Sequence, residues 1–264
     1  MTLGIIGGCG PAAGAYFYTR LIEMTDARED GEHIDVLLAG RASTPDRTAA
    51  LLYGGQSPLP AIAESARALE GGGADLLVLL CHTAHAYLPA LRSLVHIPFL
   101  DLVNLTAKAA AARGVRRLGV LCSAGTRHAH LYDRACAAQG IRAVYPDAAS
   151  RAALQEEIYR ALKGGRAEGG AALRNAASSA VFHGADGIAL ACTELSLPAA
   201  CAPTHLSVWQ AGQVANLPVL DPIDLLLRHI IPLFGRKIKA EEEMSQYASW
   251  YPAGGAVRRP LAAR

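Results

Sequence analysis

The strongest constraint on the fold of this chain is an internal repeat. The sequence GADLLVLLC at residues 73–81 is matched by GADGIALAC at residues 184–192, and GIIG at residues 4–7 is matched by GVLC at residues 119–122. Each half therefore has an early apolar run that ends in a turn and a later apolar run that ends in a cysteine. Any two strand–helix units share some likeness, but a Gly-Ala-Asp at one fixed distance from a cysteine favours two related halves in tandem.

Short apolar runs alternate with alanine-rich stretches of helical length. The runs are continuous rather than alternating, which predicts strands of a parallel sheet covered on both faces. They lie at Leu3–Gly7, Ile34–Leu38, Leu76–Leu80, Leu118–Leu121, Gly187–Leu190 and Pro218–Leu220. Alanine and leucine favour helices, which we expect at Pro60–Glu70, Leu105–Ala112, Ala149–Leu162 and Ala171–His183. The alternation predicts an α/β fold with parallel sheets.

The repeat also predicts the domain organisation. We expect a first lobe of residues 1–103 and 209–234, a second lobe of residues 104–208, and a C-terminal extension of residues 235–264. The second half ends near Pro203, and Val219–Phe234 then returns the chain to the first lobe.

Composition excludes several classes of protein. Of the 264 residues, 52% are hydrophobic, enough for a folded core, while a net charge of +2 and 6% aromatic residues argue against a nucleic-acid surface. No apolar run approaches the roughly 20 residues of a membrane span, and the N-terminus lacks the basic start of a secretory signal. We therefore expect a cytoplasmic protein whose six cysteines are thiols rather than disulfides.

Cys81 and Cys192 stand at the ends of equivalent predicted strands. Ligands of open α/β sheets bind at these ends, so facing lobes would bring both thiols to one cleft. A thiolate is a good base, although its usual pKa of about 8.5 leaves little of it ionised at neutral pH. One thiol on each face of a tetrahedral carbon is an arrangement for racemisation, because one removes the proton and the other delivers one.

The same strand ends carry groups that bind an anion. The candidates are the backbone N–H groups of His82, Thr83 and Thr193, together with the two threonine hydroxyls. The glycine-rich turn Gly7–Pro11 lets the backbone approach an anion closely, so we expect Gly8, Cys9 and Gly10 to bind substrate.

Four motifs in order resemble the aspartate/glutamate racemase family, the cofactor-independent two-cysteine racemases, and its aspartate racemase branch in particular. They are GIIGGCGP at 4–11, TPDRT at 44–48, CHTAH at 81–85 and CTEL at 192–195. The resemblance implies two pseudo-symmetric α/β lobes, each a mostly parallel sheet flanked by helices, with the active site between them. It implies an isomerase that needs no pyridoxal phosphate, acts on an acidic amino acid, and forms a homodimer.

The resemblance also implies roles for individual residues. Cys81 and Cys192 would be the two acid/base residues, Arg47 would bind the distal carboxylate of the substrate, and Lys163 would supply a second cation. The chain departs from the family pattern at four positions, which are His82 in place of asparagine, Cys9 in place of methionine, Ala191 in place of glycine, and Arg41 in place of a small or amide residue. His82 and Arg41 leave the identity of the substrate open.

Several candidate residues also have a purely structural interpretation. Free cysteine is often a small buried hydrophobe, and this is the alternative for both thiols. His85 either supports Cys81 electrostatically or caps a helix, and Glu194 beside Cys192 has the same two interpretations. Zinc sites pair cysteines and histidines, and without a Cys-x-x-Cys we expect no metal.

Two other functions stay open for the chain. One is related carbanion chemistry, an isomerisation or decarboxylation, on another amino acid or a dicarboxylate. The other is a catalytically silent protein that binds an amino acid.

Overall fold

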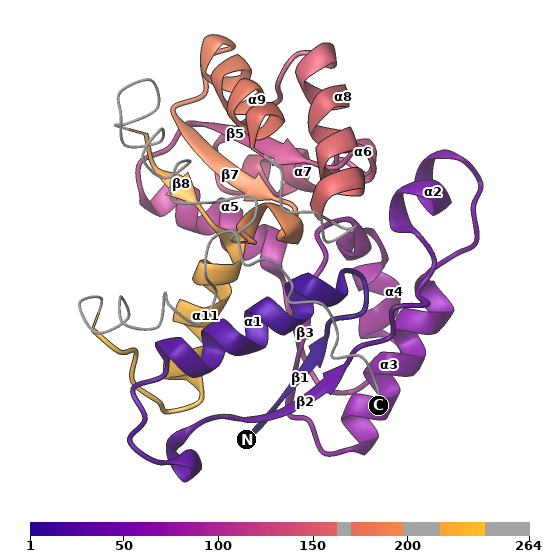
Figure 1. Cartoon of the computed structure of the whole chain (residues 1–264), viewed down its shortest axis with the longest axis vertical. Coiled ribbons are helices and arrows are strands. Elements are labelled where there is room, and N and C mark those ends of the chain that lie inside the picture. The colour runs from indigo at the N-terminus through magenta and orange to yellow at the C-terminus, as the bar shows by residue number, and fades with distance from the viewer. Residues whose placement is uncertain (163–169, 198–216, 241–264) are drawn as a thin grey trace, which may run out of the picture.

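The computed structural model describes residues 1–162, 170–197 and 217–240. Two lobes lie one above the other, each built on its own sheet (Figure 1). The lower lobe contains β1 (Thr2–Ile6), α1 (Pro11–Met24), η1 (Asp30–Glu32), β2 (Asp35–Ala39), α2 (Arg47–Leu52), α3 (Leu59–Gly71), β3 (Leu76–Leu79), η2 (Thr83–Tyr87), α4 (Leu88–Arg92) and β4 (Phe99–Leu100). The upper lobe contains α5 (Leu102–Ala112), β5 (Arg117–Cys122), α6 (Ala124–His128), α7 (Leu131–Ala138), β6 (Arg142–Val144), α8 (Ala148–Glu157), η3 (Ile158–Leu162), α9 (Ala171–Phe182), β7 (Gly187–Ala191), η4 (Thr193–Ser196) and β8 (Val219–Leu220). The helix α11 (Pro222–Leu233) follows β8.

The two sheets have the same topology. Their strand orders are β2-β1-β3-β4 and β6-β5-β7-β8, and every pair is parallel. β1 therefore corresponds to β5, and β3 to β7. The α/β fold with two related lobes and parallel sheets is confirmed.

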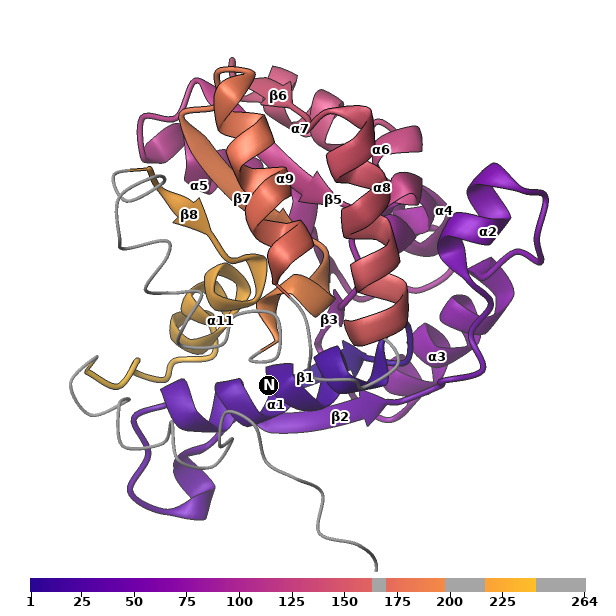
Figure 2. The same cartoon turned by 45° about the horizontal axis from the view of Figure 1, so that its top comes forward.

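Both faces of each sheet are covered, which explains the continuous apolar strands. In the lower sheet Leu76 and Val78 pack in one cluster with α1 and α11, whereas Leu77 and Leu79 pack in another with α3 and α4. In the upper sheet α8 and α9 lie side by side over one face (Figure 2), and α5 and α7 cover the other.

Aspartate side chains begin several of these helices. Asp46, Asp101, Asp147 and Asp221 precede α2, α5, α8 and α11, and each accepts a backbone N–H from the first turn. Such caps satisfy donors that have no partner within the helix. They fix where each helix starts after the sheet.

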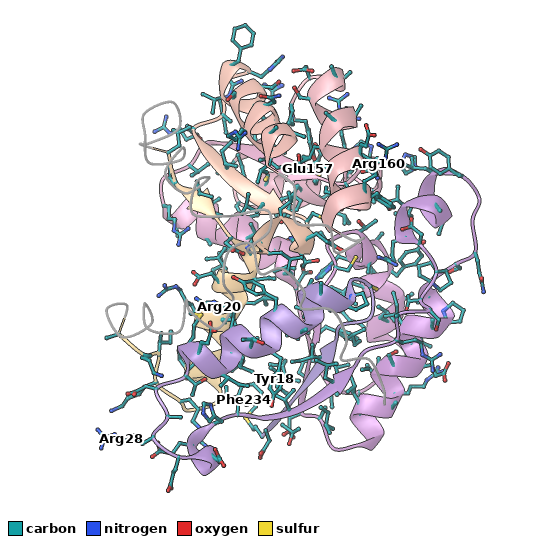
Figure 3. All side chains as sticks on the ribbon, viewed as in Figure 1. Tyr18, Arg20, Arg28, Glu157, Arg160 and Phe234 are labelled. Atoms are coloured by element: carbon teal, nitrogen blue, oxygen red, sulfur yellow. The ribbon has the colours of Figure 1, made fainter. Side chains whose placement is uncertain are left out.

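Two strands were missed by the sequence analysis. β4 has only two residues, and β6 has three and begins with the exposed Arg142. The helix expected at Ala149–Leu162 also changes character, since α8 ends at Glu157 and the chain continues as the π-helical turn η3. Figure 3 labels Glu157, the last residue of α8, and Arg160 in η3.

The chain passes between the lobes twice, from β4 to α5 and again after β8. We expected 209–234 to belong to the first lobe, but Val219–Leu220 pair with β7 in the upper sheet, and only α11 packs against α1 below. The crossing therefore lies at Asp221, which accepts a hydrogen bond from the Ser196 hydroxyl at 2.7 Å. On the other side α2 reaches up from the lower lobe to α6 (Figure 1).

Among the described residues, no helix combines the length and the apolar composition that crossing a membrane requires.

Candidate active site

Cys81 and Cys192 line one narrow cavity between the lobes. Cys81 follows β3 and Cys192 follows β7, so each stands at the carboxyl end of the equivalent strand of its sheet. Their exposed fractions are 9% and 8%. The cavity has a volume of only ≈ 10 Å³, about enough for one water molecule. A second cavity of ≈ 230 Å³ shares Arg47 and Glu194 with it, and also has Gly8, Cys9 and Gly10 in its lining.

His85 fixes the backbone at Cys81. Its Nε2 accepts the backbone N–H of Leu102 at 3.2 Å, so its Nδ1 carries the proton and donates to the Cys81 carbonyl at 2.9 Å. Burial lowers the pKa of His85, which keeps the ring neutral for both bonds. His85 therefore contacts both the Cys81 backbone and the first residue of α5, so both interpretations of this residue remain.

Arg47 brings a buried positive charge to Cys81. Its guanidinium donates to the carbonyls of Thr44 at 3.4 Å and Pro45 at 3.2 Å, and also to the carbonyl of Cys9. Burial opposes the charge, but thiolates at Cys81 and Cys9 and a hydrogen bond with Cys81 outweigh it and raise the pKa of Arg47 above its ordinary value. The guanidinium Nε is buried without a hydrogen-bond partner in the described part of the chain.

Cys192 has a carboxylate beside it instead. Its thiol donates to Glu194 Oε2 at 3.0 Å, and the Thr193 hydroxyl donates to the same oxygen at 3.1 Å. The other oxygen of Glu194 lies against the glycine-rich turn, because a Cβ at Gly10 would stand 2.5 Å from Oε1. Glu194 thus connects the upper thiol to the turn in the lower lobe.

The glycine-rich turn is held by close backbone packing. A Cβ at Gly8 would lie 2.2–2.5 Å from backbone atoms of Arg41, so only glycine fits there. The Arg41 side chain points elsewhere and forms a two-fold hydrogen-bonded ion pair with Glu64 at 2.5 Å. Arg41 is in the lining of neither cavity and supplies no charge there.

Thr83 is bound by hydroxyl groups of the upper lobe. Its Oγ1 lies 2.8 Å from Ser123 Oγ and 3.0 Å from Thr126 Oγ1. Sequence reasoning missed Ser123 and Thr126. The signal was present, because Ser123 follows the GVLC segment in the same position as Gly8 follows GIIG.

His82 lies in the lining of the cavity and is 2% exposed. Its ring is near that of Tyr132, with centroids 5.9 Å apart. Neither ring nitrogen has a hydrogen-bond partner among the described residues. Burial, with a smaller contribution from His85, lowers the pKa of His82 well below its usual value, so the ring is neutral.

Tyr159 is another residue that sequence reasoning missed. It lines the cavity from η3, and its hydroxyl donates to Asp46 at 2.9 and 3.1 Å, beside Arg47. Only the three-dimensional fold brings these residues together. Lys163, predicted as a second cation, lies outside the described residues.

The remaining described cysteines lie outside this cavity. Burial raises the pKa of Cys122 and of Cys136 to about 12, so both are neutral thiols. Cys9 contributes to the larger cavity. No three His, Cys, Asp or Glu side chains of the described segments are grouped as metal ligands.

The chain is similar to solved racemase structures over most of its length. The Picrophilus torridus aspartate racemase is 27% identical with a TM-score of 0.74, covering 92% of this chain and 98% of that one. An aspartate racemase homologue from Pyrococcus horikoshii (22%, TM-score 0.68, covering 89% and 99%) and the Campylobacter jejuni glutamate racemase (17%, TM-score 0.57, covering 95% and 98%) share the fold. The family model described as Asp/Glu/Hydantoin racemase matches residues 6–230. This chain therefore belongs to the Asp/Glu/hydantoin racemase family.

Proposed function

We propose that the protein racemises an acidic amino acid, aspartate or glutamate, by two-base proton transfer between Cys81 and Cys192. The observation that carries the proposal is that both thiols stand at equivalent strand ends of two equivalent sheets and line one cavity. Two buried hydrophobic cysteines would have no reason to share a cavity with an arginine and a glutamate.

The charges beside the two cysteines support different protonation states for them. The cation of Arg47 contacts Cys81, and a nearby cation favours the thiolate. Cys192 donates its proton to Glu194, which favours the thiol. A racemase needs one thiolate and one thiol at the start of every turnover, and this arrangement provides them.

In the proposed reaction the thiolate removes the α-proton. The electron pair of the Cα–H bond moves into the α-carboxylate as an enediolate, and the opposite thiol then delivers a proton to the other face of Cα. The two thiols exchange their protonation states, so atoms and charge balance without a cofactor. The backbone N–H groups after Cys81 and Cys192 and the neutral ring of His82 are the candidate donors to the enediolate, because the Thr193 hydroxyl already donates to Glu194.

Arg47 is the proposed recognition group for the side-chain carboxylate. A guanidinium binds a carboxylate through paired N–H groups, and the buried Nε of Arg47 has an unused donor. The similarity to a protein named aspartate racemase supports the same substrate class. We further propose that Lys163 assists, as the resemblance implies.

Access to the thiols requires movement. The cavity between them, ≈ 10 Å³, is too small for an amino acid. The adjoining ≈ 230 Å³ cavity touches Arg47 and Glu194, so we propose that substrate binds there first and that α2 and η3 separate to admit it.

The test is α-proton exchange in deuterated water, followed by NMR and chiral chromatography, across both enantiomers of the common amino acids. We expect deuterium incorporation and inversion with aspartate or glutamate, and neither in the double variant C81S/C192S. Exchange only with an amino acid that lacks a side-chain carboxylate would overturn the substrate assignment. Tight binding without exchange would identify a silent binding protein instead.

A further inference from the structure

The upper lobe contains a cavity that the proposed reaction does not use. It has a volume of ≈ 330 Å³, within the range of roughly 300–1,000 Å³ typical of small-ligand sites. Its lining comes from the segments after β5 and β6 and from one residue of the lower lobe, and comprises Leu52, Cys122, Ser123, Ala124, Arg127, His128, Ala148, Arg151, Ala152 and Gln155. None of these residues is acidic, so the cavity is positively charged.

This cavity corresponds in position to the ≈ 230 Å³ cavity of the lower lobe. There, the lining comes from the turn after β1 and from α2, which follows the neighbouring strand β2. Here, it comes from the turn after β5 and from α8, which follows the neighbouring strand β6. Both helices begin after a capping aspartate, and Arg47 is the first residue of α2 whereas Arg151 is the fourth residue of α8. Both are at carboxyl ends of strands, where α/β sheets bind ligands.

The two arginines are held in position by one short segment. Arg127 lies over the ring of Tyr145, 5.4 Å from its centroid, and Arg151 donates to the carbonyl of Pro146 at 2.6 Å. Both cations act on the Cys122 thiol and favour its charged form, although burial dominates there. Each guanidinium group thus already has a contact with residue 145 or 146 that limits its motion, so a ligand would have less ordering to do on binding.

We propose that this cavity is a second anion-binding site, for a small dianion such as a dicarboxylate or a phosphate group. Two guanidinium groups offer paired donors to such an anion. Ser123 lines both this cavity and the one between the cysteines, and Leu52 ends the helix that Arg47 begins. An occupant would thus contact both lobes beside the thiols, without touching either thiol.

The test measures binding by isothermal titration calorimetry with the full chain, using succinate and inorganic phosphate as separate probes at low ionic strength. We expect at least one probe to bind, and to bind at least 10-fold more weakly to the double variant R127Q/R151Q. Binding by R47Q, which alters the other cavity, should persist. Arg134→Gln is the matched control, because Arg134 is an exposed arginine of α7 outside this lining. Tighter binding of succinate indicates a dicarboxylate site, and tighter binding of phosphate indicates a phosphate site.

Three results would overturn the proposal. They are equal affinity of all variants, loss of binding in R47Q alone, and no binding of either probe to the unaltered protein. Circular dichroism checks that the double variant is folded, and the single variants R127Q and R151Q, each expected to bind at least 3-fold more weakly, replace it if it is not. The readout is binding, so it is independent of whether the protein racemises amino acids.

Discussion

The two lobes share a strand order but place different chemistry at equivalent strand ends. The lower lobe has a glycine-rich turn after β1 and a buried arginine next to Cys81, whereas the upper lobe has Ser123 after β5 and a glutamate next to Cys192. The repeat offset that aligns Cys81 with Cys192 aligns His82 with Thr193 and Thr83 with Glu194. A duplicated fold thus supplies two symmetric positions, and the side chains around them make the two thiols unlike.

The most direct test of the difference between the two thiols is to remove one at a time. We expect Cys81→Ser and Cys192→Ser each to lower racemisation by about 10³-fold, because a positioned acid or base contributes roughly 10²–10⁴-fold. The remaining thiol still faces one side of Cα, so each variant should exchange the α-proton of one enantiomer only, and the two variants should select opposite enantiomers. NMR in deuterated water measures this.

Cys136→Ser is the control for the loss of a thiol, because Cys136 is a buried cysteine of the upper lobe outside the cavity. Its racemisation rate per folded molecule should stay unchanged. Exchange of the same enantiomer by both active-site variants would disprove the placement of the thiols on opposite faces.

The charges beside the thiols give the next largest effect. Arg47→Gln removes the cation beside Cys81, and we expect kcat/KM for the acidic substrate to fall about 10- to 100-fold, the loss of one hydrogen bond to a charged group. The acid limb of the pH profile should move to higher pH, because the thiolate loses its cation. Glu194→Gln removes the negative charge beside Cys192, so the alkaline limb should move to lower pH, by up to about one unit.

Profiles of kcat/KM between pH 5 and 10 measure both shifts. Arg41→Gln is the control, because the Arg41 side chain pairs with Glu64 away from the cavity. If Arg47→Gln and Glu194→Gln moved the same limb of the pH profile, the assignment of a thiolate to Cys81 and a thiol to Cys192 would be wrong.

The fold was largely predictable because its strands are buried on both faces. The six apolar runs all coincide with strands within one or two residues, and the repeat predicted two related lobes. The strands that were missed, β4 and β6, are edge strands of two and three residues, but the two-residue edge strand β8 was predicted, so shortness alone does not explain the two misses. Residues 219–220 were assigned to the wrong sheet because sequence cannot show where a chain changes lobe.

The site was predictable only where local sequence decides it. The positions of Cys81 and Cys192 at strand ends follow from the apolar runs, whereas the need for glycine at position 8 comes from the Arg41 backbone, which is distant in sequence. The contacts of Tyr159 with Asp46, and of Thr83 with Ser123 and Thr126, join residues far apart in the chain. Such contacts depend on how two lobes meet, which no local pattern encodes.

A methyl group added at Gly8 tests the packing of the glycine-rich turn, and one added at Gly125 tests the junction between the lobes. A Cβ at Gly8 meets the Arg41 backbone at 2.2 Å, and a Cβ at Gly125 meets the Thr83 and Thr48 side chains at 2.7 and 2.8 Å. We expect Gly8→Ala to lower the free energy of unfolding by about 1–3 kcal/mol, as overpacking does. Gly125→Ala should cost less stability, because the lobes can move apart, and should also reduce activity, because Thr83 lines the cavity between the thiols.

Urea unfolding and racemisation rates for both variants measure this difference. Gly31→Ala is the control, since a Cβ there meets nothing within 4 Å. Unchanged activity per folded molecule in Gly125→Ala would show that Gly125 does not set the fit between the lobes.

The smallest effect concerns His82, whose counterpart in the upper lobe is the non-titrating Thr193. The folded state lowers the pKa of His82 well below 6.5 because the ring is buried. Below about pH 6.5 the unfolded chain therefore binds a proton that the folded chain does not, so the free energy of unfolding falls as the pH falls. His82→Asn removes this group, and its stability should depend less on pH by up to about 1.4 kcal/mol per unit.

Urea unfolding at pH 7.5, 6.0 and 5.0 measures the slope for His82→Asn and for the unaltered protein. His85 has a pKa lowered in the same direction and stays in both proteins, so a residual acid sensitivity is expected. His128→Asn, at an exposed histidine of the upper lobe, is the control for the substitution itself. An unchanged slope in His82→Asn would contradict the prediction, because His82 would then bind as many protons in the folded chain as in the unfolded chain, and the acid sensitivity would have to come from other groups such as His85.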